Sequence, residues 1–136
     1  MVQQLSFSSK SENLNLVEML IDEVCAKNNV NDDYYGNILI AITEAVNNAI
    51  HHGNKSNPDK SVSVQYNSKG DILFFTIEDE GAGFDFDNLP DPTDPKNIEK
   101  PHGRGVFLMK NLCDKIDFFD GGSKVKIEFN VGKKPE

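Results

Sequence analysis

The spacing of hydrophobic and polar positions predicts three helices. Hydrophobic residues recur at helical spacing over residues 11–27, and again from the capping residues 31–33 to about His52. A third helix is expected to begin at residues 103–105, with Val106, Met109, Cys113 and Ile116 on one face. The core-facing residues predicted for the first two helices are Leu14, Val17, Leu20, Ile21, Val24 and Cys25, and then Ile38, Ile42, Ala45, Val46 and Ala49.

Alternation with a period of two predicts five strands. The first is Gln3–Ser8, residues 62–66 and 71–79 form a pair, and residues 115–119 and 124–131 form another across a glycine turn. Helices gathered on one face of a mixed, mostly antiparallel sheet make an α+β two-layer sandwich. The pattern predicts one domain over residues 1–132, followed by a loose tail at 133–136.

Charge and composition narrow the possible partners. The 136 residues include 22 acidic and 14 basic side chains, and the net charge of −8 disfavours binding to a nucleic acid backbone. No apolar run reaches the roughly 18 residues of a membrane span, and the N-terminus lacks the pattern of a secretory signal. A cytoplasmic protein without membrane contact is expected. Cys25 and Cys113 are predicted to be buried thiols rather than a disulfide or a metal site.

The end of the second helix carries acid, amide and imidazole groups. Glu44 and Asn48 lie one helical turn apart, and His51, His52 and Gly53 follow before a polar turn at residues 54–60. A carboxylate can accept a proton and an amide oxygen suits a hard cation, so the pair fits a Mg²⁺-nucleotide site. A solvated helix face that ends at Gly53 explains the same residues about equally well.

Two glycine clusters shift the balance toward a nucleotide site. Asp79 ends its strand on the apolar side, where its carboxylate needs a donor such as a purine amino group or a backbone N–H. Gly81 and Gly83 would let a flat ligand lie against the backbone. Gly103 and Gly105 open the third helix, where free N–H groups favour phosphate oxygens. Either cluster alone is weak evidence for a nucleotide site, and neither is a P-loop or a Rossmann fingerprint.

The segment between the clusters has little periodic pattern. Residues 84–102 are rich in proline and aspartate. A loop of this length inside a compact domain is usually functional, so a lid is expected at about 84–102.

Taken in order, the three motifs resemble those of a known ATP-binding domain. Glu44-x-x-x-Asn48 with His52-Gly53 is similar to the N-box of the Bergerat-type (GHKL) domain of histidine kinases, gyrase-like ATPases, Hsp90 and MutL. The residues 79–83 and 103–105 are similar to its two glycine boxes. Within that superfamily, the segments 91–95 (DPTDP) and 103–109 (GRGVFLM) resemble the small bacterial anti-sigma-factor serine/threonine kinases.

The resemblance implies a role for most of the motif residues. Glu44 would be the general base that activates the attacking hydroxyl, and Asn48 would coordinate Mg²⁺. Asp79 would bind the adenine amino group, with Gly81 and Gly83 lining the pocket of the base.

Roles at the phosphate end follow in the same way. Gly103 and Gly105 would hold the phosphates under the lid, where Arg104 either adds positive charge or is a solvated loop residue. His52 matches the position of the family histidine without an assigned role. His51 departs from the many superfamily members that carry lysine or arginine there, which leaves its part in phosphate binding open.

The resemblance also implies a function. The expected protein uses ATP and Mg²⁺ to phosphorylate a serine or threonine on an anti-sigma-factor antagonist of the STAS type, binds a sigma factor, and is compatible with a homodimer. Phosphorylation adds roughly −1.5 to −2 charges and can break a protein interface. One alternative is a nucleotide-gated binding module without phosphoryl transfer. Another is a detached histidine-kinase catalytic domain, which is disfavoured because no phospho-acceptor helix precedes the motifs.

Overall fold

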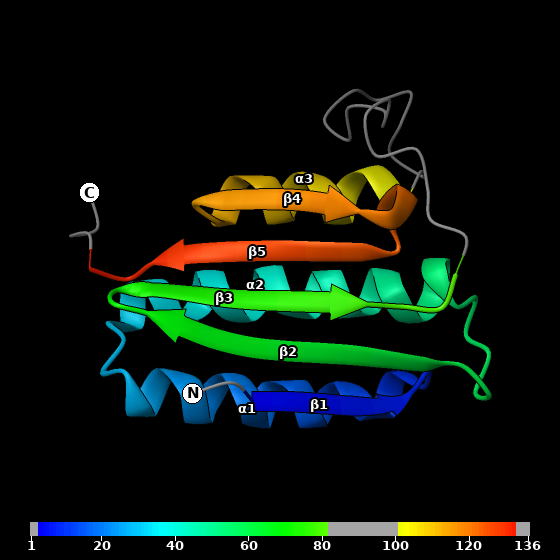
Figure 1. Cartoon of the computed structure of the whole chain (residues 1–136), viewed down its shortest axis with the longest axis horizontal. Coiled ribbons are helices and arrows are strands. Elements are labelled where there is room, and N and C mark those ends of the chain that lie inside the picture. The colour runs from blue at the N-terminus through cyan, green and yellow to red at the C-terminus, as the bar shows by residue number, and fades with distance from the viewer. Residues whose placement is uncertain (1–2, 82–100, 133–136) are drawn as a thin grey trace.

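Five strands form one sheet in the computed structural model, which describes residues 3–81 and 101–132. The order of the strands across the sheet is β1-β2-β3-β5-β4 (Figure 1). Their bounds are β1 (Gln3–Ser8), β2 (Ser61–Lys69), β3 (Ile72–Glu78), β4 (Lys115–Phe119) and β5 (Lys124–Asn130).

Every pair of neighbouring strands is antiparallel. The expectation of a mixed sheet is therefore wrong in this detail. β3 and β4 do run in the same direction, but β5 lies between them and pairs with both. After α3 (Pro101–Leu112), the chain enters β4 at the edge of the sheet. The hairpin from β4 then places β5 between β4 and β3.

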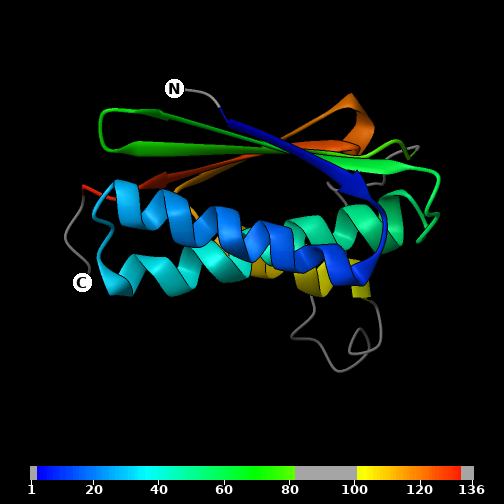
Figure 2. The same ribbon diagram turned by 90° about the horizontal axis from the view of Figure 1, so that it is seen from below.

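Three helices cover one face of this sheet, as Figure 2 shows. α1 (Leu14–Lys27) follows a short 3₁₀ turn, η1 (Ser11–Asn13), and α2 (Asp32–Asn48) continues into a π-helical turn, η2 (Ala49–Gly53). Another 3₁₀ turn, η4 (Asp120–Gly122), joins β4 to β5. The predicted α+β two-layer sandwich is confirmed.

The core lies between the two layers and follows the predicted pattern. All the core-facing residues predicted for the first two helices are buried except Leu14, which is half-buried and packs against the core. From the sheet, the inward residues of β3 and β5 contribute the largest fully buried side chains, and Phe75 and Phe129 meet edge to face at 6.1 Å.

Polar residues fix the start of α2 as expected. Asn31 has an extended backbone, and its side chain accepts a hydrogen bond of 2.9 Å from the N–H of Asp33. Asp32 and Asp33 occupy the first turn, where negative charge complements the helix dipole. The cap thereby fixes where the long helix that carries Glu44 and Asn48 begins.

The third helix differs from its prediction at both ends. α3 begins at Pro101, a residue suited to a first helical position, so residues 103–105 lie inside its first turns. It ends at Leu112, which leaves Cys113 half-buried just beyond it and places Ile116 in β4. Of the two free cysteines, Cys25 is buried as predicted, and burial raises the pKa of its thiol to about 11.

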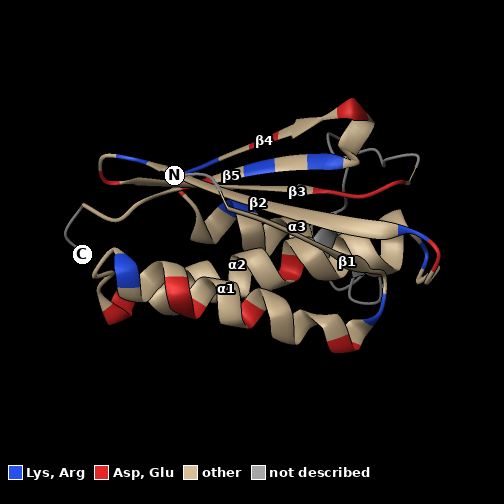
Figure 3. Cartoon of the chain, turned by 60° about the horizontal axis from the view of Figure 1, so that its bottom comes forward, with Lys and Arg blue, Asp and Glu red and all other residues tan. Residues whose placement is uncertain are grey.

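Acidic residues are concentrated on the helical layer, along α1 and at the start of α2, whereas lysines mark β5 (Figure 3). No helix in residues 3–81 or 101–132 is both long enough and apolar enough to cross a membrane. Gly83, the tail at 133–136 and all of the predicted lid except residues 101 and 102 lie outside the described residues.

Candidate functional site

A pocket opens where the end of α2 meets the end of β3, the β4–β5 turn and α3. Its apolar walls include Ile77, Met109 and Phe118. Its polar lining comes from four side chains, Asn48, His52, Asp79 and Ser123. An apolar pocket with a few convergent polar groups is the usual form of a small-molecule site.

The helix that supplies Asn48 and His52 changes its winding at the pocket. η2 closes with a hydrogen bond of 2.9 Å from the N–H of Asn54 to the carbonyl of Ala49, which is five residues earlier. Such π turns are rare and occur frequently at functional sites.

The two histidines of η2 have different surroundings. His52 is half-buried and lines the pocket. His51 is exposed, and its ring nitrogens lie 3.0 Å from Ser11 Oγ and 2.8 Å from Ser56 Oγ. His51 therefore connects the helix end to η1 and to the turn that follows it.

Asp79 is held by backbone groups on both sides. Its N–H donates to the carbonyl of Ser123 at 2.9 Å, and its Oδ1 accepts from the N–H of Gly81 at 2.7 Å. Burial raises the pKa of this carboxyl, and the Gly81 N–H opposes that rise. The backbone donor expected for Asp79 is thus present, and a carboxylate retains acceptor sites for a further donor.

Two glycines bring the N-box and the first glycine cluster into contact. A Cβ on Gly53 would collide with the Asp79 carboxylate, and a Cβ on Gly81 would collide with the carbonyl oxygen of Gly53. Gly53 was expected as a helix end and as part of the N-box, and its contact with Asp79 gives a physical reason for a glycine there.

A third glycine joins α3 to α2. A Cβ on Gly105 would lie 2.8 Å from Nδ2 and 3.0 Å from Oδ1 of Asn48, closer than real side chains approach. The predicted third motif therefore packs directly on the first. The backbones of Gly103 and Arg104 belong to the same helix, but their side-chain surroundings are outside the description.

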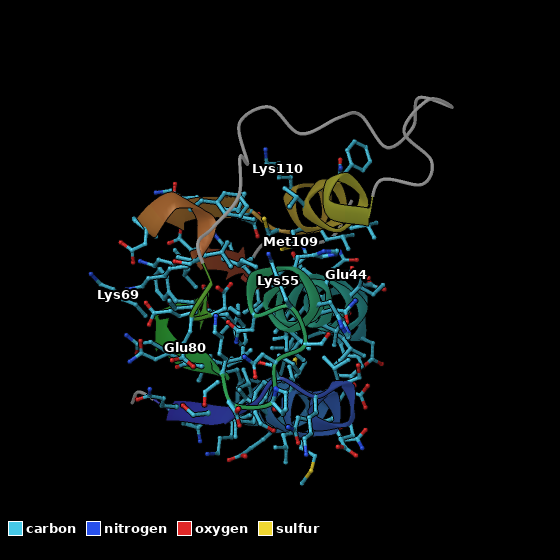
Figure 4. All side chains as sticks on the ribbon, turned by 90° about the vertical axis from the view of Figure 1, so that its right-hand side faces the viewer. Glu44, Lys55, Lys69, Glu80, Met109 and Lys110 are labelled. Carbon is cyan, nitrogen blue, oxygen red and sulfur yellow. The ribbon has the colours of Figure 1, made fainter. Side chains whose placement is uncertain are left out.

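Glu44 does not line the pocket itself. It is half-buried on α2, one turn before Asn48 (Figure 4). The structure thus brings Asn48, His52, Asp79, Gly81 and Gly105 together and leaves Glu44 beside this group.

One buried polar residue at the site was not singled out from the sequence. Asn54 was assigned to a polar turn, yet it is 1% exposed and hydrogen-bonds to the loop that follows Asp79. Its position directly after His52-Gly53 was the available signal.

Few side chains at the site could bind a metal ion. Within the described ranges, no group of three or more His, Cys, Asp or Glu side chains is arranged to hold a metal ion. The Asn48 amide oxygen at the pocket is a ligand of the kind that Mg²⁺ accepts, and Mg²⁺ usually takes only one or two protein ligands beside phosphates and water.

Comparison with known families agrees with the three motifs. Residues 7–129 match the histidine kinase-like ATPase domain. The chain belongs to this family. The resemblance to Bergerat-type ATP-binding domains is thereby confirmed, and with it an ATP-binding domain.

Two relatives of this chain are named anti-sigma F factors. The chain is 29% identical to an anti-sigma F factor of Clostridium perfringens over 129 residues, which cover 90% of this chain and 91% of that protein. It is 30% identical to an anti-sigma F factor of Geobacillus stearothermophilus over 116 residues, covering 82% and 78%.

A solved structure shares the fold. The RsbU and RsbW domains of Rv1364c from Mycobacterium tuberculosis superpose with a TM-score of 0.65 at 15% identity, over 95% of this chain and 31% of that one.

Proposed function

We propose that this protein is an ATP-dependent serine/threonine protein kinase that phosphorylates an anti-sigma-factor antagonist and sequesters a sigma factor. The observation that carries the proposal is the contact of all three motifs around one pocket, through Gly53 against Asp79 and Gly105 against Asn48. The two relatives described above are named anti-sigma F factors, which supports the choice of partners.

In this proposal, the pocket holds the adenine base. Ile77, Met109 and Phe118 supply apolar surface for a flat ring, and the Asp79 carboxylate accepts from the exocyclic amino group. The close backbone approach at Gly53 and Gly81 keeps that carboxylate at the rim of an apolar cavity, where a hydrogen bond to a charged group is strong.

The phosphates would extend toward the first turns of α3. Free backbone N–H groups at a helix start favour anions; Gly103 lies in the first turn of α3, and Arg104 and Gly105 directly follow it. Asn48 contacts Gly105, so its amide oxygen lies at the same place and would hold Mg²⁺. When bound, Mg²⁺ supplies positive charge that offsets charge on the transferring phosphoryl group.

Glu44 would act as the general base, one turn from Asn48 and outside the base pocket. The hydroxyl oxygen of the substrate attacks the γ-phosphorus, the bond from that phosphorus to ADP breaks, and the hydroxyl proton passes to the Glu44 carboxylate. The product is a phosphorylated serine or threonine on the antagonist, with ADP as the leaving group.

Phosphoryl transfer to the antagonist tests the proposal directly. Purified protein, Mg²⁺ and γ-labelled ATP are mixed with the cognate antagonist, and label is followed on serine or threonine. If the protein binds the antagonist and nucleotide but transfers no label, a nucleotide-gated binding module replaces the kinase. The proposal includes a cytoplasmic location and a homodimer, and sedimentation equilibrium of the purified protein tests the dimer.

A further inference from the structure

Asn54 is a buried amide directly after Gly53, which lines the pocket. It directly follows η2, and only 1% of its surface is exposed. A buried amide is costly unless its donors and acceptors are paired, so its hydrogen bonds show what it holds.

The side chain of Asn54 joins three separate segments. Its Nδ2 donates to Ser9 Oγ at 2.8 Å and to the carbonyl of Ser61 at 3.0 Å, which lie after β1 and at the start of β2. Its Oδ1 accepts from the N–H of Glu80 at 2.8 Å. The backbone N–H of Asn54 meanwhile closes the π turn on Ala49.

The loop that carries Asp79 has three successive N–H groups, each with a different acceptor. Asp79 donates to the carbonyl of Ser123, Glu80 donates to Asn54 Oδ1, and Gly81 donates to Asp79 Oδ1. The first bond ties the loop to Ser123, directly before β5, and the last is internal. The Asn54 bond is the one of these three that ties the loop to the end of η2, where Gly53 contacts the Asp79 carboxylate.

We propose that Asn54 is a positioning residue that sets the Asp79 carboxylate for adenine recognition. Without the bond from Glu80 N–H to Asn54, the loop keeps its bonds to the carbonyl of Ser123 and, through the Glu80 carboxylate, to the N–H of Ser61. It loses the bond to the residue that follows Gly53, so the carboxylate is less firmly held at the pocket. The inference rests on the proposed contact between Asp79 and the adenine amino group. It adds that the preference for adenine over a purine without that amino group depends on Asn54.

A ratio of two affinities tests the proposal. Calorimetry measures the dissociation constants of the whole chain for ATP and for purine riboside triphosphate, which lacks the amino group. The wild type should bind ATP more tightly. In Asn54→Ala this preference should shrink by about three- to tenfold, a part of the effect expected for a lost hydrogen bond to a charged group. Equal losses for both nucleotides would show a merely structural role and overturn the proposal.

Stability is controlled with a core variant remote from the loop. Val24 on α1 is fully buried, so Val24→Ala should lower the melting temperature without changing the ratio. If Asn54→Ala does not fold, Asn54→Ser serves in its place. Its shorter hydroxyl does not reach Glu80 N–H but leaves room for a water at Ser9 and Ser61, and the same fall in the ratio is expected.

The outcomes separate this inference from the proposed function. If the wild type binds both nucleotides equally well, the proposed contact between Asp79 and the adenine amino group is wrong, and the inference about Asn54 is wrong with it. A wild-type preference that both Asn54 variants retain overturns the role of Asn54 alone and leaves the adenine site intact.

Discussion

The carboxylate of Asp79 fills the space that a side chain at Gly53 would need. Gly53 closes η2 at the end of the long helix, and Asp79 follows β3, the middle strand of the sheet. The acid proposed to bind adenine is therefore packed against the backbone of the N-box, and a change at either residue should affect both.

Gly53→Ala should damage the pocket because the added methyl collides with the Asp79 carboxylate. Overpacking of this kind costs about 1–3 kcal/mol. Thermal unfolding should report that loss, and ATP affinity measured by calorimetry should fall as the carboxylate is displaced.

Gly36→Ala is the matched control. Gly36 lies in α2, and a Cβ there meets nothing within 4 Å. Alanine should stabilise the helix by about 1 kcal/mol and leave ATP affinity unchanged. Equal ATP affinity in both glycine variants would mean that the contact between Gly53 and Asp79 has no part in binding.

Asp79→Asn should weaken ATP binding by about tenfold to a hundredfold, because the amide cannot form the charge-assisted bond to the adenine amino group. The asparagine Oδ1 can still accept from the Gly81 N–H, so the loop should keep its shape. Calorimetry with a folded variant provides the measurement. Unchanged affinity would remove Asp79 from the adenine pocket.

The same substitution should stabilise the nucleotide-free protein at neutral pH. Burial raises the pKa of Asp79 in the folded state, so the folded protein binds its proton more tightly than the unfolded chain, whose pKa is about 3.9. The contribution of Asp79 to stability therefore falls as pH rises from the unfolded to the folded pKa. Above that window, the charged form destabilises the fold.

Thermal unfolding of wild type and Asp79→Asn from pH 7 down to about pH 4 checks this sign. The variant should melt at the higher temperature at pH 7, and the difference should shrink as the wild-type carboxyl becomes protonated. A difference in melting temperature that stays constant over this pH range would show that the charge of Asp79 does not cause it. Higher stability together with weaker ATP binding is the pattern of a residue retained for function.

Much of the fold could be predicted because its signals are local. The 3.6-residue spacing of Ile38, Ile42 and Ala45 and the cap at Asn31 are properties of neighbouring residues, and both are confirmed. The wrong expectation of a mixed sheet concerns strand order. β5 inserts between β3 and β4 through a hairpin, and such an insertion depends on packing between distant segments.

The residues of the candidate site also fall into those that the sequence predicted and those that depend on distant contacts. Residue type and motif order singled out Asn48 and Asp79, and the structure places both at one pocket. The side-chain contacts of Asn54 could not be predicted, since its partners Ser9 and Glu80 are 45 and 26 residues away in the chain. Helix α3 begins earlier than expected because Pro101 can occupy a first helical position, two residues before Gly103.

Asn48→Ala should separate metal-dependent from metal-independent binding. If the Asn48 amide holds Mg²⁺, its loss should weaken binding of ATP in the presence of Mg²⁺ and affect ADP binding in EDTA much less. Because the Asn48 amide also packs on Gly105, thermal unfolding of the variant must be measured alongside. Equal losses with and without Mg²⁺ would identify Asn48 as a packing residue between α2 and α3.

Glu44→Gln decides the identity of the base. Glutamine keeps the shape and hydrogen-bonding reach of the side chain but cannot take the proton of the attacking hydroxyl. Since Glu44 does not line the base pocket, the variant should bind ATP and the antagonist as the wild type does. Its rate of phosphoryl transfer should fall by about 10²–10⁴-fold, the usual contribution of a general base.

Single-turnover transfer of label to the antagonist, with both reactants saturating, measures this rate without interference from product release. Glu18→Gln, on the exposed surface of α1, is the control for loss of one negative charge and should transfer at the wild-type rate. A Glu44→Gln protein that also transfers at that rate would leave the kinase in place and exclude Glu44 as its base. A fall in ATP affinity together with rate would instead place Glu44 in nucleotide binding, because a residue that acts only as a base leaves ground-state binding unchanged.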